Sequence, residues 1–318
     1  VAAGLVNGRL VHGRLGRFDG GVGDGEESST ARFVDQTGTW KAHKSTSCRA
    51  ALFLDDITIL SGGGDGSISV SNVERSKVTA HTSDSSAEED DGINCLLKLS
   101  DGDVFAAGYD GGTVCMYDRR ALGSGLKPVA SHSSHTDFVS DMDFDPARKK
   151  LISVSGDGTV CVFDSRSGKL VARSEDDADD EMLSVAIMKG GKKVVCGHQS
   201  GVLDIYSWGY WNDCSDRFPG HPGHVDSMAK VDEDTLLTGS SDGLVRLVSI
   251  LPNKAIGFIG EHAAEYSVER LALDPTAGFL ASCSHDNIVK VWDVAELFEE
   301  GGDSDVDEGE KGGDSDAE

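Results

Sequence analysis

Residues 151–164 read LISVSGDGTVCVFD, and this stretch decides the fold. Apolar residues alternate with small or polar ones on both sides of a Gly-Asp-Gly turn, which is the period-two pattern of β-strands. An Asp-Gly turn supplies the positive φ angles that a tight hairpin needs. The stretch therefore predicts a β-hairpin that turns near Gly158.

The same pattern recurs along the whole chain. Its turn residue lies at Gly8, Gly66, Gly112, Gly158, Gly201, Gly243 and Asn287, so the turns after Gly66 are 42 to 46 residues apart. A short strand precedes most hairpins, as at 139–144, and a weaker one often follows, as at 170–173. Four antiparallel strands per repeat, seven times over, predict an all-β fold, a seven-bladed β-propeller.

The propeller is expected to occupy residues 1–297, with a flexible loop at 18–30, acidic insertions at 84–91 and 175–181, and an acidic disordered tail at 298–318. The chain starts inside the second strand of blade 1, and the acidic tail follows the third strand of blade 7. We therefore expect 26 strands and an incomplete closure between blades 7 and 1. Either a truncated start or an open seam explains this pattern.

Composition narrows the class of protein. The 318 residues include 40 Gly and only 6 Pro, which indicates many tight turns. The net charge is −26, so net charge does not drive non-specific binding to nucleic acid. The 7 Cys form no Cys-x-x-Cys pair, which indicates reduced thiols in an intracellular protein. No apolar run approaches the roughly 18 residues of a membrane span.

No motif indicates catalysis. The glycine run 62–66 lies in a hairpin turn and not at a helix N-terminus, so it does not predict a phosphate site. His221 and His224 have no evident cysteine or acid beside them, whereas zinc usually needs three or four ligands. We expect no catalytic residue, cofactor, metal site, small-molecule substrate or membrane contact.

The repeats resemble WD repeats. Trp292-Asp293 ends the third strand of blade 7, and Tyr117-Asp118 and Phe163-Asp164 take the same place in blades 3 and 4. In WD repeats a histidine before the inner strand, the turn aspartate and a strand Ser or Thr form a buried hydrogen-bonded network. Histidines before inner strands are His43, His81, His135, His224 and His262.

This resemblance implies structural roles for the network residues. In blade 4 it assigns His135, Asp157 and a serine at 153 or 155. Buried turn N–H groups left unpaired cost roughly 1–3 kcal/mol each, and an aspartate can accept from them. The turn acids expected in this role are Asp65, Asp110, Asp157, Asp242 and Asp286.

Longer segments resemble one subfamily. Residues 145–158 (DPARKKLISVSGDG), 240–262 and 279–297 are similar to the WD-repeat protein 55 family, nucleolar proteins linked to ribosomal RNA processing and ribosome assembly. The resemblance implies a non-catalytic scaffold in ribosome biogenesis whose partners are pre-ribosomal proteins. It also implies a location in the nucleus and nucleolus, with the cytoplasm as a further possibility.

Two groups of residues in the turns each allow two interpretations. In a four-stranded meander the first-to-second and third-to-fourth turns share one face, opposite the acidic insertions. Basic residues expected on that face are Arg148, Lys149, Lys150, Lys189, Lys192 and Lys193. They indicate a contact with RNA or an acidic protein. The alternative is ordinary solvated side chains, which the lack of interleaved aromatic residues favours.

The second feature is an Asp-x-Arg ending on two consecutive repeats, Asp118 with Arg120 and Asp164 with Arg166. It resembles the docking motif of substrate receptors of cullin-RING ubiquitin ligases, although both copies lack the Trp of that motif. The alternative function is therefore a substrate receptor that binds the ligase adaptor. The plainer interpretation is a strand-end arginine paired with a neighbouring acid.

Overall fold

The computed structural model describes residues 2–5, 7–15, 34–82, 91–99, 104–121, 127–175, 180–263 and 266–295. The expected loop at 18–30 and tail at 298–318 lie outside these residues, as do most of the insertion at 84–91 and the middle of that at 175–181. The described residues form 26 strands and one short 3₁₀ helix, η1 (Arg119–Ala121). The predicted strand number is confirmed.

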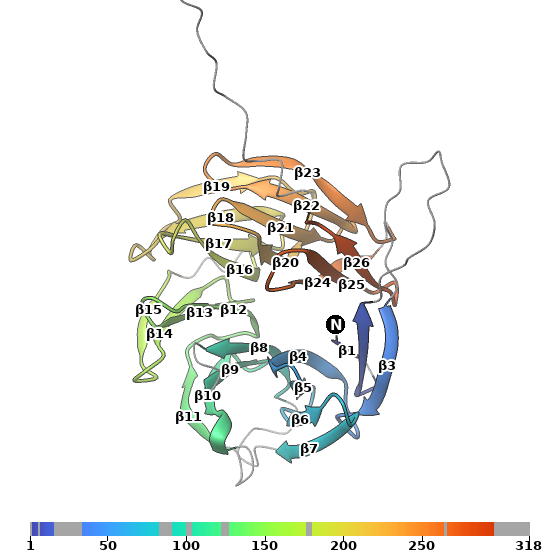
Figure 1. Cartoon of the computed structure of the whole chain (residues 1–318). Coiled ribbons are helices and arrows are strands. Elements are labelled where there is room, and N and C mark those ends of the chain that lie inside the picture. Colours follow the sequence, from blue (N-terminus) through green and yellow to red (C-terminus); the bar gives the residue numbers. More distant parts are fainter. Residues whose placement is uncertain are drawn as a thin grey trace, which may run out of the picture.

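The strands form seven small antiparallel sheets that follow one another in chain order around a ring (Figure 1). The inner strands are β4 (Cys48–Asp55), β8 (Ile93–Leu99), β12 (Val139–Asp145), β16 (Met182–Met188), β20 (Val225–Lys230) and β24 (Val268–Leu273). The second strands are β1 (Ala2–Gly4), β5 (Thr58–Gly63), β9 (Val104–Tyr109), β13 (Lys150–Ser155), β17 (Lys193–His198), β21 (Thr235–Ser240) and β25 (Phe279–Ser284).

The outer half of each sheet completes the blade. The third strands are β2 (Arg9–Leu15), β6 (Ile68–Asn72), β10 (Thr113–Asp118), β14 (Val160–Asp164), β18 (Val202–Ser207), β22 (Leu244–Ser249) and β26 (Val289–Asp293). The outer strands are β3 (Val34–Lys41), β7 (Lys77–Thr82), β11 (Pro128–Ser133), β15 (Leu170–Arg173), β19 (Asp216–Pro219) and β23 (Lys254–Glu261). The chain is thus a seven-bladed β-propeller, as its sequence predicts.

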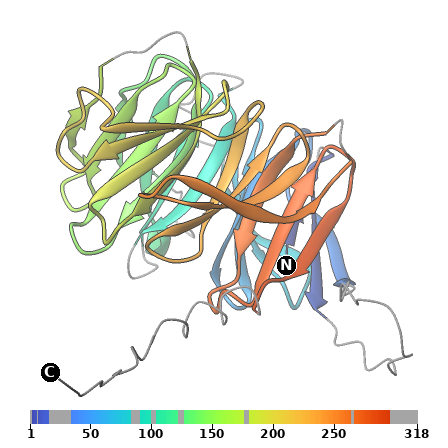
Figure 2. The ribbon, with the colours of Figure 1, turned by 90° about the horizontal axis from the view of Figure 1, so that it is seen from above.

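Within the described residues, the first and the last sheet each have one strand fewer than the others, as the sequence predicts. Five sheets have four strands, whereas the first (β1-β2-β3) and the last (β24-β25-β26) have three within the described residues. The turn at Gly8 aligns β1 with the second strands, so blade 1 has no inner strand and blade 7 no outer strand among these residues. The N-terminal strand lies beside the last blade in both views (Figures 1 and 2).

The hydrophobic core lies between blades and not within them. Ile152 and Val154 of blade 4 belong to one buried cluster with Val185 and Ile187 of blade 5. Corresponding clusters join each of the other consecutive pairs of blades within the described residues. Fully burying one such aliphatic side chain contributes roughly 1.5–3 kcal/mol, so each blade depends on its neighbour for stability.

Each of the six inner strands has a bulge at its second residue. In blade 4 the pairing with β13 shifts between Val139 and Asp141, and the other five inner strands shift at the equivalent place. The bulge is followed by polar side chains that reach the next blade. Ser140 Oγ lies 2.6 Å from the carbonyl oxygen of Met182, and Asp141 accepts the N–H of Val185 at 3.1 Å. Neighbouring blades are therefore joined by hydrogen bonds as well as by apolar contact.

Candidate functional site

The histidine network of blade 4 is buried and fully connected. His135 lies with Nε2 2.7 Å from Ser153 Oγ and Nδ1 2.9 Å from Thr159 Oγ1. Asp157 accepts the N–H groups of Thr136 at 2.8 Å and of Thr159 at 3.0 Å. Burial opposes ionisation of Asp157, but the hydrogen bonds from His135, Thr159 and Thr136 outweigh it and hold its pKa far below the ordinary value. Of the two serines proposed from the sequence, Ser153 is the one that contacts His135.

Three other turn acids act in the same way in their own blades. Asp65 accepts from the hydroxyl of Ser67 at 2.6 Å and from its N–H at 3.1 Å. Asp286 lies 2.8 Å from Nδ1 of His262 and accepts the N–H of Ile288. Asp242 accepts the N–H of Leu244 at 3.2 Å and is bound by the guanidinium of Arg246. These carboxylates therefore stabilise the hairpin turns by accepting their N–H groups.

Asp110 departs from the prediction. It is bound by Arg49 of blade 2 at 2.6 Å and accepts from Asn94 at 2.8 Å, while the N–H of Gly111 is capped by Asp91 instead. The reason is a one-residue offset. Asp110 stands two residues before the positive-φ Gly112, whereas Asp157 directly precedes the positive-φ Gly158.

The histidine of blade 6 is also different from the expected one. His221, not His224, is the buried histidine, with Nε2 2.8 Å from Thr238 Oγ1. Burial lowers its pKa to about 4, so the ring is neutral at physiological pH. Because His221 is used in the blade, the two histidines do not converge on a metal, and the described residues hold no group of three or more metal-ligating side chains.

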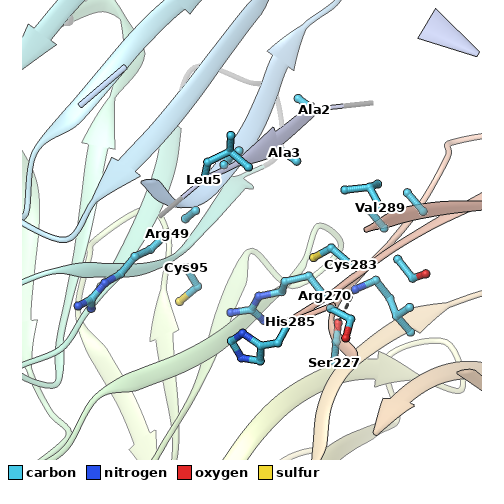
Figure 3. A pocket seen from close by; sticks show the side chains of 18 of the residues that line it. Ala2, Ala3, Leu5, Arg49, Cys95, Ser227, Arg270, Cys283, His285 and Val289 are labelled. Atoms are coloured by element: carbon cyan, nitrogen blue, oxygen red, sulfur yellow. Dashed lines mark hydrogen bonds between the residues drawn. The ribbon is translucent and has the colours of Figure 1, made fainter. Parts of the chain in front are cut away.

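A cavity of about 940 Å³ opens where the first and last blades approach the axis (Figure 3). Arg270 crosses it and donates to the carbonyl oxygen of Ser140 at 3.1 Å, on the opposite side of the ring. Burial raises the pKa of Cys95 to about 12 and also raises that of Cys283. Both thiols are therefore protonated at neutral pH, a form that is neither nucleophile nor metal ligand.

Other polar groups of the cavity serve the fold. Ser227 Oγ accepts the N–H of Leu271 at 2.9 Å, which joins blades 6 and 7. His285 pairs with Glu269 at 3.1 Å on the exposed rim. The cavity thus brings together groups that are already engaged with one another, in an arrangement that suits structural contact better than acid–base chemistry.

The Asp-x-Arg endings differ from each other. Arg120 folds back on its own Asp118, with Nη2 2.6 Å from the carboxylate, as the plainer interpretation predicts. Asp164 instead pairs with Lys150 at 2.6 Å, and the exposed Arg166 donates its backbone N–H to Asp164. The two motifs therefore present different surfaces to a partner.

The basic turns do share a face, as the topology predicts. The N–H of Ser165, in the third-to-fourth turn of blade 4, donates to Lys149 in the first-to-second turn at 3.0 Å. In blade 5 the N–H of Trp208 donates to Lys192 at 2.9 Å. The acidic half of the expected charge polarity falls mostly on residues outside the described ones.

The charge on this face is partly neutralised. Arg148 pairs with Asp145 at 2.5 Å, Lys150 with Asp164, and Lys189 with Asp234 at 2.6 Å. Lys193 hydrogen-bonds the hydroxyls of Ser207 and Ser215, which carry no charge. Lys192 is exposed. The cationic part of the face is therefore concentrated near Lys192 and Lys193.

An aromatic loop that the sequence interpretation overlooked lies beside these lysines. Residues 208–211 read Trp-Gly-Tyr-Trp and connect β18 to β19. The guanidinium carbon of Arg148 lies 4.6 Å from the ring centroid of Trp208, and Tyr210 is 77% exposed. Aromatic and basic residues are therefore interleaved here after all. The signal was available, since the loop holds three aromatic residues in four positions of a chain that is 6% aromatic.

Among the described residues no helix is long and apolar enough to cross a membrane. All seven cysteines are free, and five of them are buried.

Comparisons with known proteins agree with this architecture. The chain matches the WDR55 family over residues 16–297. WD repeat-containing protein 55 of Arabidopsis thaliana is 40% identical over 303 residues, which cover 94% of this chain and 78% of that protein. The human protein of the same name is 38% identical over 256 residues, 80% of this chain and 64% of that protein. WD repeat-containing protein JIP5 of Cryptococcus neoformans is 32% identical over 281 residues, 84% of this chain and 74% of that protein.

A solved structure with a similar fold is that of the computationally designed Ika8 protein. It aligns with a TM-score of 0.61 at 18% identity, over 90% of this chain and 80% of that chain. At this identity the likeness shows the fold alone, and the family is shown by the sequence matches. The chain belongs to the WDR55 family of WD-repeat proteins.

Proposed function

We propose that this protein is a non-catalytic scaffold of ribosome biogenesis, which holds pre-ribosomal proteins together during the processing of ribosomal RNA. Membership of the WDR55 family supports the proposal, because the segments that resemble that family span most of the propeller. A WD-repeat propeller suits docking because its turns present two rigid faces to partners.

The proposal of a non-catalytic role is supported by the reactive side chains, which are buried or hydrogen-bonded within the fold. In blade 4, His135 and Asp157 are bound within the turn network. In the cavity, Cys95 and Cys283 have raised pKa values because they are buried. These groups are committed to the fold, which leaves exposed turn residues to make the functional contacts.

Depletion tests this proposal directly. Rapid depletion of the protein, followed by hybridisation of pre-rRNA with probes to the spacer regions, should show accumulation of precursor species. Restoring the wild-type chain should reverse the accumulation. Normal precursor levels after complete depletion would rule the proposal out. Affinity purification with mass spectrometry should recover pre-ribosomal proteins.

We place the protein in the nucleus and nucleolus as part of the same proposal. A fluorescent fusion should colocalise with a nucleolar marker and disperse when rRNA transcription is inhibited. A purely cytoplasmic signal from a functional fusion would contradict this location.

A second candidate function is that of a substrate receptor of a cullin-RING ubiquitin ligase. The observation in its favour is Arg166, which is exposed at the end of the second Asp-x-Arg motif and whose backbone N–H is fixed on Asp164. Charge reversal of Arg120 and Arg166 together should abolish recovery of the ligase adaptor in pull-downs. Recovery that is unchanged in this double variant would dismiss the second candidate.

A further inference from the structure

The surface beside the aromatic loop carries both basic side chains and an exposed aromatic ring. We define the basic–aromatic patch as Arg148, Lys149, Lys192, Trp208 and Tyr210. Its parts come from two neighbouring blades: the turn after β12, the turn after β16 and the loop after β18. The N–H of Trp208 donates to the carbonyl oxygen of Lys192, which fixes the loop against the lysine turn.

The aromatic half of the patch is rigidly supported. Trp211 is 8% exposed and packs edge-to-face on Trp208, with ring centroids 5.4 Å apart. Tyr206 also stacks on Trp211, with ring centroids 6.5 Å apart. Trp211 therefore anchors the loop in the core between blades 4 and 5, while Tyr210 projects outward. An exposed ring on a fixed base loses little conformational entropy when something stacks on it.

The basic half is arranged around the same rings. The guanidinium of Arg148 lies over the Trp208 ring and is held at 2.5 Å by Asp145, whose side chain is 5% exposed. Arg148 also lies close to the lysine turn, since a Cβ added at Gly191 would lie 2.3 Å from Arg148 Nη1. The arginine, the lysine turn and the aromatic loop are thus packed together as one unit.

Charge and residue type together favour one kind of partner. Protein–protein interfaces use Tyr, Trp and Arg but are depleted in lysine. Here Lys149 and Lys192 lie in the two turns beside the aromatic loop, and Lys193 follows Lys192 as the first residue of β17. Lysines that contact phosphates, next to rings that stack on bases, are what proteins use to bind single-stranded nucleic acid. A chain with a net charge of −26 can do so only through such a local patch.

We infer that the basic–aromatic patch binds single-stranded RNA, with a base stacked on Tyr210 and backbone phosphates held by Lys192 and its neighbours. The inference deepens the proposed function, on which its biological setting rests, by naming the class of ligand and the place where it binds. Recognition by stacking and phosphate contact is tolerant of sequence, so a short generic strand is a sufficient probe.

Fluorescence anisotropy with a labelled ten-residue oligouridylate tests the inference on the full chain. We expect binding at low salt that weakens as salt rises, with a slope of roughly −0.7 per phosphate contact. Tyr210→Ala should weaken binding roughly 5- to 100-fold, whereas Tyr210→Phe should leave it nearly unchanged because the ring remains. Lys192→Glu should weaken binding and make the salt slope shallower.

Matched controls lie on the outer edge of blade 6. Phe258 is 72% exposed and Lys254 is exposed, both on β23 and outside the patch. Phe258→Ala and Lys254→Glu should bind the probe like wild type. Thermal unfolding should show that each variant is folded.

Three results would overturn the inference. They are an absence of binding at low salt, equal loss of binding in the Tyr210→Ala and Phe258→Ala variants, and a deca-glutamate peptide that binds as tightly as the oligonucleotide. The last would identify an acidic protein as the partner. If the oligonucleotide fails to bind while depletion still disturbs pre-rRNA, only this inference falls and the proposed function stands.

Discussion

Asp143 of blade 4 accepts the backbone N–H of Ile187 in blade 5 at 2.7 Å. The other carboxylate oxygen accepts the N–H of Phe144, also at 2.7 Å, so the carboxyl group joins two inner strands across a blade boundary. Burial raises the pKa of this carboxyl to about 6, against the opposing effect of the two N–H donors.

This raised pKa predicts a pH-dependent contribution to stability. The native state holds the proton of Asp143 more tightly than the unfolded chain does, so the contribution is fully present below about pH 4 and is lost as pH rises through 6. Asp143→Asn removes this titration. Between pH 4 and pH 7, the free energy of unfolding of wild type, measured with urea, should fall by on the order of 2 kcal/mol relative to that of Asp143→Asn. The exposed Asp56→Asn change should follow wild type throughout, and parallel curves for all three would contradict the prediction.

His221 should change the pH dependence of stability in the opposite direction to Asp143, because it stabilises the fold at higher pH. Burial lowers its pKa to about 4, so the unfolded chain takes up a proton more readily than the native state. The contribution is therefore present above about pH 6.5 and is lost as pH falls toward 4. Between pH 7 and pH 5, wild type should lose on the order of 2 kcal/mol relative to His221→Gln. His224→Gln, at an exposed histidine of the same loop, serves as the control and should keep the wild-type slope.

The two kinds of turn acid should differ in their effect on unfolding. Asp157→Ala leaves the N–H groups of Thr136 and Thr159 without their acceptor in a buried turn, so we expect a loss of about 2–4 kcal/mol. Asp110→Ala removes a half-exposed pair with Arg49 and should cost only about 0–1 kcal/mol. Chemical denaturation of both variants measures the difference. Equal losses would mean that Asp110 holds its turn as Asp157 does.

Two rings of the aromatic loop, Trp211 and Tyr210, should differ in their contribution to stability. Trp211→Ala removes a buried ring from the core between blades 4 and 5 and should destabilise the chain by about 3–5 kcal/mol. Tyr210→Ala should change the unfolding free energy by less than about 0.5 kcal/mol, because its side chain is exposed. Thermal or urea unfolding checks both values, and a large loss on Tyr210→Ala would show that the ring is part of the core.

Much of the fold was accessible from the sequence because strand alternation and turn glycines repeat together. The predicted inner strand at 139–144 agrees with β12 (Val139–Asp145) to within one residue, and the predicted outer strand at 170–173 coincides with β15 (Leu170–Arg173). The positions of the outer strands β3 and β19 were not predicted, although the expected 26 strands include them. Asp216–Pro219 is mostly exposed on both faces, so its sequence needs little apolar alternation.

Residues of the turns were predicted less well, for a geometric reason. A hydrogen-bonding side chain must stand at one exact position relative to the positive-φ glycine. Asp110 misses that position by one residue and pairs with another blade, and His221 rather than His224 reaches the blade interior. The bulges of the inner strands left no mark in the sequence pattern. The aromatic loop did leave one, but its meaning depends on Arg148, which lies 60 residues away in the chain.

The bonds between inner strands join residues one repeat apart along the chain. Ser140 reaches Met182, Ser184 reaches Val225, and Asp143 reaches Ile187. A substitution in one unit thus alters the environment of the corresponding place in the following unit. Blades of such a chain cannot diverge independently. Lineages that exchange one residue of a hydrogen-bonded pair should show a compensating exchange at its partner in the next blade. A blade grafted from a foreign propeller should fold in place only when its contact residues on both neighbouring blades are transplanted with it.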